Sequence, residues 1–253
     1  MMIKTFEIEK VINGEKVILF PSLLHCRGKL YLIDCGYEET FENYLEELNR
    51  QNFSIHQIEG IIISHDDIDH LGGLGKFKDC KPSIRVLCGA LEEPSVAGRV
   101  KSERLVQAEN SLESLPAEHK NWAIGFIDSL KSIQRFEVNK TFDDGEVFEE
   151  EVQIVHTPGH TKGHISLFIK GSKTLIANDA LVIDKGEFEI ANPAFTLDLD
   201  AALASVQKIK KLKAKKIICY HGGIMEKGIE AKLDSLLSRY HQHETRTILN
   251  HSA

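Results

Sequence analysis

The 253-residue sequence lacks long apolar runs, paired cysteines and an excess of basic residues. No apolar run approaches the roughly 18 residues that a membrane-spanning helix needs, and the opening residues MMIKTFEIEK contain no apolar stretch long enough for a secretory signal. The five cysteines are scattered, odd in number and free of any C-x-x-C pair. We therefore expect reduced thiols, a cytoplasmic location and no membrane partner.

The charge balance is acidic, with 31 basic and 38 acidic side chains and a net charge of -7. Such a surface has no bulk attraction for nucleic acid, so we expect no nucleic-acid partner. Hydrophobic residues make up 42% and charged residues 27% of the chain, as in an ordinary globular protein. A chain of this length can bury a sizeable core without disulfides, and we expect one domain over residues 1–253.

Short apolar runs separated by turns predict an α/β protein with many strands. The expected strands cover residues 17–20, 30–33, 60–63, 84–87, 152–155, 165–169, 174–177 and 216–219. Helical spacing of apolar residues predicts helices over 39–52, from 198 or 200 to about 212, and again after 223. Two more helices are predicted inside an insertion at about 91–132, which would serve either as a lid or as a cover for a sheet face.

Polar clusters follow four of the predicted strands. They are His65-Asp66-Asp67-Ile68-Asp69-His70, His156-Thr157-Pro158-Gly159-His160 with His164 beyond it, Asn178-Asp179, and His221 before two glycines. Strand ends are places where a rigid scaffold can aim side chains at one point. The first cluster has two histidines and three aspartates in six residues, which is too polar for a core. We therefore expect these clusters to form one functional site.

Imidazole and carboxylate groups in this pattern indicate a metal site, because they are the usual ligands of zinc, iron and manganese. Ligands one or two residues apart must point in different directions, so the loop at 65–70 can serve two metals. The distant His160, Asp179 and His221 would complete the ligand sets, and Asp179 can bridge because a carboxylate has two oxygens. Two cations about 3.5–4 Å apart would bind and acidify a water molecule.

In these motifs the chain resembles the metallo-β-lactamase superfamily of hydrolases. The usual first signature, H-x-H-x-D-H, reads His65-x-Asp67-x-Asp69-His70 here, and HTPGHTKGH resembles the second signature of glyoxalase II-type members. Asn178-Asp179 matches the bridging position, His221 the last ligand, and Leu32-Ile33-Asp34-Cys35-Gly36 an early strand-Asp-Gly motif. The resemblance spans about residues 15–225, and residues 91–132 lie outside its motifs.

The resemblance implies an αββα four-layer sandwich, in which two mixed β-sheets face each other with helices outside. It implies one metal position formed by His65, Asp67 and His160, a second formed by Asp69, His70 and His221, and Asp179 as the bridge. The expected cofactors are two divalent metal ions, with zinc expected first and iron or manganese as alternatives. Asp34 and His164 are expected to support the site, whereas His156 is expected to be structural or to support the site.

Asp67 departs from the family pattern, which has histidine at this position. A carboxylate is a harder ligand and adds a negative charge, which favours iron or manganese. Three outcomes are open: two metals with altered metal choice, which we favour, a metal at the second position only, or Asp67 displaced from the ligand set. Asp66 is expected to point away from Asp67 if the loop is extended.

The leading hypothesis is a metal-dependent hydrolase that cleaves an ester, thioester, lactone or related bond in a small molecule. Asp69 would be the catalytic residue, because it can orient the hydroxide or pass its proton to the leaving group. The alternatives are an iron-dependent oxidoreductase of the same fold, suggested by Asp67, a nuclease, and a non-catalytic metal-binding module. A homodimer is the default expectation for a compact enzyme.

Overall fold

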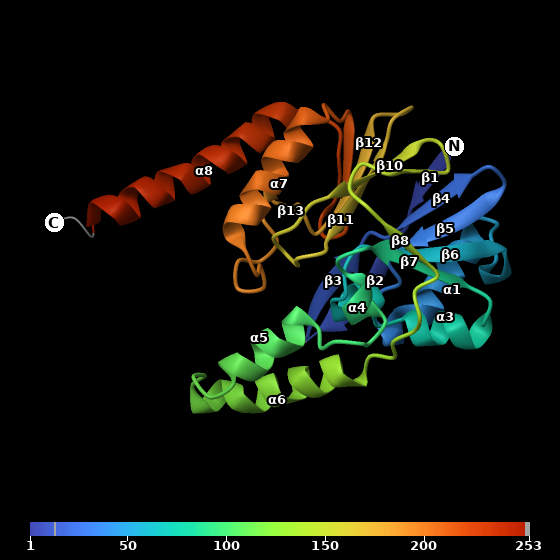
Figure 1. Ribbon diagram of the computed structural model, residues 1–253, viewed down its shortest axis with the longest axis horizontal. Coiled ribbons are helices and arrows are strands. Elements are labelled where there is room, and N and C mark those ends of the chain that lie inside the picture. The colour runs from blue at the N-terminus through green and yellow to red at the C-terminus, as the bar shows by residue number, and fades with distance from the viewer. Residues whose placement is uncertain (13, 251–253) are drawn as a thin grey trace.

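The computed structural model describes residues 1–12 and 14–250 and, within these ranges, the side chains up to residue 240 (Figure 1). Two six-stranded sheets form the centre of this part of the chain. The first sheet has the order β1 (Met2–Thr5), β4 (Ser22–Cys26), β5 (Lys29–Ile33), β6 (Ile58–Ile63), β7 (Arg85–Gly89) and β8 (Lys140–Phe142). The second has the order β16 (Gly223–Met225), β15 (Lys216–Cys219), β12 (Thr174–Asn178), β11 (Ile165–Ile169), β10 (Val152–His156) and β9 (Val147–Phe148).

Helices and two hairpins complete the described structure. The hairpins pair β2 (Ile8–Ile12) with β3 (Glu15–Leu19) and β13 (Val182–Asp184) with β14 (Glu187–Glu189). The helices are α1 (Phe41–Arg50), α2 (Ile68–Leu71), α3 (Leu74–Cys80), α4 (Glu93–Val96), α5 (Glu103–Ser111), α6 (Ala117–Ser132), α7 (Leu199–Lys211) and α8 (Ile229–Asn250). Short 3-10 turns cover Glu38–Thr40 and Ile55–Gln57. In this part of the chain, none of the helices combines the length and apolar composition needed to cross a bilayer.

The two sheets face each other with helices outside, as Figure 1 shows. Alternate residues of each strand point to opposite faces. Ile33 and Ile62 of the first sheet join Ile154, Leu167 and Ile218 of the second in one buried cluster between the sheets. This alternation produces the four layers of the predicted αββα sandwich, which is therefore confirmed.

The opposite faces of the sheets pack against helices. Leu32, Ile61 and Ile63 of the first sheet share a cluster with Tyr44 of α1 and Phe77 of α3. On the second sheet, a separate cluster joins strand residues Leu175 and Ile217 to Leu203, Val206 and Leu233 of α7 and α8. The helical period of these apolar residues thus buries one side of each helix.

The sequence predicted the central strands because these strands are buried on both faces. The β5–β6 and β6–β7 pairs are parallel, and the last four residues of β6 are all buried. Parallel strands of this kind are near-continuous apolar runs, which explains why the sequence predicted them. The second sheet also contains a parallel pair, β12 and β15. The strands β8, β9, β13 and β14 contain only two or three residues, too few for a periodic pattern.

The insertion after β7 contains the two predicted helices, α5 and α6, and the short α4. Leu105 of α5 packs against Ile127 and Leu130 of α6, and Ile68 of α2 joins the same cluster. No strand residue belongs to this cluster among the residues that the structure describes. The helix pair therefore lies beside the loop at 65–70, and in Figure 1 α5 and α6 extend away from both sheets.

A tight turn after β15 positions His221, and this turn requires the backbone conformation of Gly222. Gly222 has φ +90°, and a Cβ atom there would overlap the carbonyl of Ile183, whose N–H donates to the His221 carbonyl at 3.0 Å. We expect Gly222→Ala to lower the free energy of unfolding by more than about 3 kcal/mol, through backbone strain plus this overlap. Urea unfolding of the metal-free protein measures the loss.

Gly186 is the matched control, because it has φ +79° and no heavy atom lies within 4 Å of the position that a Cβ would occupy. Gly186→Ala should cost only the strain of the left-handed backbone, about 1 kcal/mol. Equal losses in the two alanine variants would contradict a role for the Ile183 contact.

Candidate metal centre

Asp34 ties the end of β5 to the loop that follows β6. Its side chain is fully buried, and its Oδ1 accepts the backbone N–H of Ser64 at 2.7 Å. Its Oδ2 accepts the Ser64 hydroxyl at 2.7 Å and lies 2.8 Å from Nδ1 of His70. A carboxylate bound to one imidazole nitrogen orients the ring, so the other nitrogen, Nε2 of His70, is directed at the site. This supporting role is the one that the sequence predicted for Asp34.

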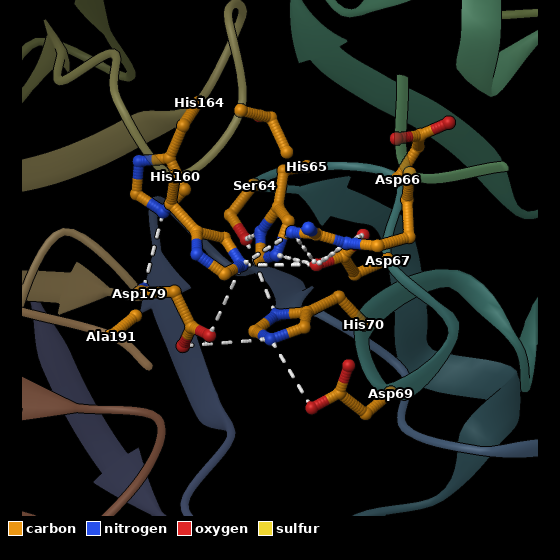
Figure 2. A network of polar contacts seen from close by, with 12 residues as sticks. Ser64, His65, Asp66, Asp67, Asp69, His70, His160, His164, Asp179 and Ala191 are labelled. Atoms are coloured by element: carbon orange, nitrogen blue, oxygen red, sulfur yellow. Dashed lines mark hydrogen bonds and ion pairs between the residues drawn. The ribbon is translucent and has the colours of Figure 1, made fainter. Parts of the chain in front are cut away.

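All seven predicted ligands converge in the structure. They are His65, Asp67, Asp69, His70, His160, Asp179 and His221. The loop after β6 supplies four of them, the β10–β11 connection supplies His160, and the ends of β12 and β15 supply Asp179 and His221. Figure 2 shows most of this cluster, with the side chains of His65, His70, His160 and Asp179 facing one another.

Two groups of side chains can be distinguished. The Asp67 group consists of His65, Asp67 and His160, and the His70 group consists of Asp69, His70 and His221. Within each group the potential ligand atoms lie within 4.8 Å of one another. These are the two predicted sets, and either contains the nitrogen and oxygen donors that suit a divalent cation.

Asp179 lies between the two groups. Its Oδ1 is 3.6 Å from Nε2 of His70, and its Oδ2 is 3.5 Å from Nε2 of His221 and 3.7 Å from Nε2 of His160. One carboxylate therefore contacts both groups, which is the geometry that the predicted bridging role requires.

Four buried atoms of the ligand residues lack any hydrogen-bond partner, Nδ1 of His160 and three atoms that lie together. The three are Nε2 of His65, Nε2 of His70 and Oδ1 of Asp179, which belong to residues whose ligand atoms lie within 4.8 Å of one another. A buried polar atom without a partner is costly and rare in proteins. A divalent cation would satisfy all three atoms, so the residues present fit a metal ion.

The carboxylates of the centre are ionised. Burial alone would raise the pKa of Asp67, but hydrogen bonds with His160 and His65 and the charge of Arg104 hold that pKa well below its usual range. Burial is likewise opposed at Asp179, where His221 and His70 keep the pKa well below the ordinary value. Both groups are therefore in the form that binds cations.

His164 supports the site, as the sequence predicted. Its Nε2 accepts the backbone N–H of Asp179 at 3.2 Å, and its Nδ1 lies 2.9 Å from the Thr157 hydroxyl, which contacts Ser166. Burial and the neighbouring His65 hold the pKa of His164 well below the usual value, so the ring is neutral. His156 lies away from the cluster, where its Nε2 contacts the Lys162 carbonyl at 2.9 Å, so its role is structural.

Asp66 points away from the cluster, as Figure 2 shows and the sequence predicted. Its Oδ2 lies 3.1 Å from Nη1 of Arg135, and its backbone N–H donates to Oε1 of Glu92 at 3.0 Å. Glu92 also accepts the Thr161 hydroxyl at 3.2 Å. These contacts connect the loop at 65–70 to the start of the insertion and to the residue after His160.

Arg104 is the residue that sequence reasoning missed. It lies in the first turn of the insertion helix α5, is 2% exposed, and contacts both oxygens of Asp67: Nε lies 3.0 Å from Oδ1, and Nη2 lies 2.8 Å from Oδ2. In the sequence it is one arginine in an amphipathic helix, 37 residues from its partner. The single signal that could have revealed it was the surplus negative charge at Asp67.

A cavity of about 400 Å³ opens onto the centre. Asp67, Asp69, His160, Asp179 and His221 line one end of it. Its other walls include Ile68, Phe126, Leu130, Val182 and Phe195. Trp122 does not line this cavity; it stacks on Phe126 with ring centroids 5.4 Å apart and is 53% exposed.

The fold and the site define a class of protein. The family model of the Metallo-beta-lactamase superfamily matches residues 23–221, so the chain belongs to this superfamily. The chain is 26% identical over 261 residues to the "Probable metallo-hydrolase YflN" of Bacillus subtilis (strain 168), with 92% of each protein covered. It is 29% identical over 178 residues to an "N-acyl homoserine lactonase" of a Bacillus species, covering 68% of this chain and 59% of the lactonase.

Solved structures share the fold. A metallo-beta-lactamase family protein from Thermus thermophilus matches with a TM-score of 0.70 and 20% identity, covering 98% of this chain and 82% of that one. AidC, described as a dizinc quorum-quenching lactonase, matches with a TM-score of 0.59 and 21% identity, covering 83% of this chain and 75% of AidC. At these identities the likeness concerns the fold alone.

The contacts of Asp34 predict its effect on metal binding. In Asp34→Asn the side chain keeps its size, but one of its two oxygens becomes an amide that cannot accept from Ser64 or His70. We expect zinc affinity to fall about 10- to 100-fold, as when the partner of a liganding histidine is lost. Competition with a chromophoric chelator measures it, and the exposed Asp79→Asn variant serves as control. Unchanged affinity in Asp34→Asn would argue that His70 needs no such support.

The raised pKa of buried Glu92 is expected to make the stability of the protein depend on pH. Burial and the charge of Asp66 raise its pKa well above the usual value, so the folded protein holds a proton that the unfolded chain releases above its pKa of about 4.3. The free energy of unfolding then falls as pH rises through this window. Glu92→Gln removes this dependence, and its stability relative to the parent should grow by roughly 1 kcal/mol or more between pH 5 and pH 8 in urea unfolding. A constant difference would show that Glu92 is ionised in the folded state.

Proposed function

We propose that the chain is a metal-dependent hydrolase that cleaves an ester, thioester, lactone or related bond in a small molecule. The observation that carries the proposal is the position of the ligand cluster, which forms one end of a cavity whose remaining walls are largely apolar. Pockets of this kind, with a few convergent polar groups, are typical substrate sites.

The metal would be held by residues drawn from His65, Asp67, Asp69, His70, His160, Asp179 and His221. Zinc is the first expectation because AidC, a relative in fold, is described as dizinc, and iron or manganese are the alternatives. A divalent cation supplies Lewis acidity and lowers the pKa of a water molecule.

Asp69 is proposed as the catalytic residue. Its Oδ2 lies 3.1 Å from Nε2 of His221 and 3.7 Å from Nε2 of His70, and the carboxylate lines the cavity. Its backbone carbonyl accepts the buried Tyr220 hydroxyl at 2.7 Å, which fixes the loop. Asp69 can therefore hold a proton between the water and the leaving group at a defined position.

The apolar walls suggest which substrates fit. Ile68, Phe126 and Phe195 present hydrocarbon and aromatic surface next to the polar end, so an acyl or similar apolar group would bind beside the bond to be cleaved. The lactonase relative supports this class, since a lactone is a cyclic ester, although the chain spans 59% of that protein. A small-molecule substrate, a cytoplasmic location and a homodimer remain predictions.

The redox alternative depends on Asp67, whose carboxylate suggested iron. That carboxylate is engaged by Arg104, so an arginine partner explains an aspartate at this position without any change of metal. The hydrolase is therefore the function that the geometry supports better, and oxygen uptake by iron-loaded protein would test the alternative.

Metal removal and an Asp69 variant test the proposal. Chelator-treated protein should lose turnover on a panel of acyl thioesters, lactones and aryl esters and regain it with zinc. Asp69→Asn should lower kcat by at least about 100-fold, because the amide cannot carry the proton. Asp79→Asn is the control, and circular dichroism checks that each variant is folded. Full turnover after chelation, or in Asp69→Asn, would rule out this mechanism.

A further inference from the structure

The two groups of the metal centre differ in how their charges are balanced. In the Asp67 group the single carboxylate has an arginine partner, Arg104. In the His70 group, Asp69 and the neighbouring Asp179 contact histidines, and no lysine or arginine lies within 4.0 Å of either among the described residues. Buried carboxylates must be compensated by hydrogen bonds or by a cation. The His70 group therefore lacks a cation that the Asp67 group already has.

The guanidinium of Arg104 lies where it competes with a metal ion. Its Nη2 is 2.8 Å from Oδ2 of Asp67 and 3.4 Å from Nε2 of His160, so one nitrogen approaches two of the three atoms that would hold an ion in the Asp67 group. The same Oδ2 lies 3.2 Å from Nε of Arg104 and 2.9 Å from Nε2 of His160. An oxygen with two lone pairs is thus approached by three nitrogen atoms before any metal is considered.

Arg104 is also held firmly in this position. Its Nη1 donates to Oε1 of Gln107 at 2.7 Å, and the guanidinium carbon lies 5.3 Å from the ring centroid of Phe195. Moving it to admit a metal ion would leave its charge buried without a partner.

Most of the ligand-residue atoms that have no partner belong to the set formed by His65, His70 and Asp179. Nε2 of His65, Nε2 of His70, Oδ1 of Asp179 and Nδ1 of His160 are unpartnered, whereas the oxygens of Asp67 and Nε2 of His160 have polar contacts. His70 belongs both to this unpartnered set and to the His70 group. Three of these four atoms therefore belong to the set that contains His70, while the Asp67 carboxylate is already engaged.

We propose that Arg104 takes the place of one metal ion, so that the chain binds a single divalent ion around His70. The inference deepens the proposed function, since it concerns the same centre. The ion's ligands would come from His65, Asp69, His70, Asp179 and His221, and the Asp67 group would contain the guanidinium instead. Of the three outcomes left open for Asp67, this is the second, a metal at one position only, and not the two-metal site that we favoured from the sequence.

The test is a count of bound ions that needs no substrate. The parent protein is stripped with chelator, reloaded with excess zinc, desalted and analysed by plasma mass spectrometry, and the measurement is repeated with manganese. The parent should bind about one ion per chain, and Arg104→Met about two, because Asp67 is then free to act as a ligand. Lys101→Met removes a nearby exposed cation that pairs with Glu109, and should still bind about one.

A double variant guards against loss of folding in Arg104→Met. Asp67→His together with Arg104→Met removes both charges and leaves three imidazoles at that position, so it too should bind about two ions. Two ions per parent chain would overturn the inference, as would a single ion in both Arg104 variants when circular dichroism shows them folded. Anomalous scattering from zinc-loaded parent crystals provides an independent count if neither variant folds.

The outcome is separable from that of the proposed function. A parent protein with one ion and no turnover on the ester panel would leave this inference standing and remove the proposed chemistry. Two ions with chelator-sensitive turnover would do the reverse.

Discussion

Buried negative charge is the constraint on which the rest of the structure depends. Asp34, Asp67, Asp69 and Asp179 gather around four imidazoles at the junction of the two sheets, and each is at most 16% exposed at its side chain. Carboxylates in such a place are tolerated only when hydrogen bonds or cations compensate them. Asp34 is compensated by Ser64 and His70, and Asp67 by Arg104. Asp69 and Asp179 have histidines as their charged partners, so these two carboxylates are the ones for which a metal ion would matter most.

The sandwich makes this concentration of charge possible because its rigid parts all end at the site. β6, β12 and β15 are interior, largely buried strands, each with a parallel neighbour, and each is followed at once by ligands. Apolar clusters on both faces of each sheet fix these strand ends. The cost of assembling the charged centre is therefore met by core burial that is independent of it, which is how an apolar scaffold can hold unfavourably placed polar groups.

The sequence predicted most of this because the relevant signals were local. The apolar runs of the central strands and the clusters that end them could be recognised within a few residues, whereas the supporting roles of Asp34 and His164 followed from the resemblance to the superfamily. The short strands β8, β9, β13 and β14 were too brief to show a pattern. The role of Arg104 could not be predicted, because it depends on a contact with Asp67, 37 residues away in the sequence. The packing of α5 and α6 against Ile68 creates this contact. Val182 and Phe195, which line the cavity, could not be predicted either, because they come from segments without a motif.

Asp67 and Arg104 are best understood as one unit. An aspartate alone in place of the family's histidine would add a charge to a centre already rich in carboxylates, whereas the ion pair is neutral overall, as imidazole is. The pair differs from histidine in that its oxygens are already engaged by donors. The insertion that carries Arg104 also supplies Phe126 and Leu130 to the cavity. One helical segment, outside every motif of the superfamily, therefore influences both the charge balance of the centre and the shape of the space in front of it.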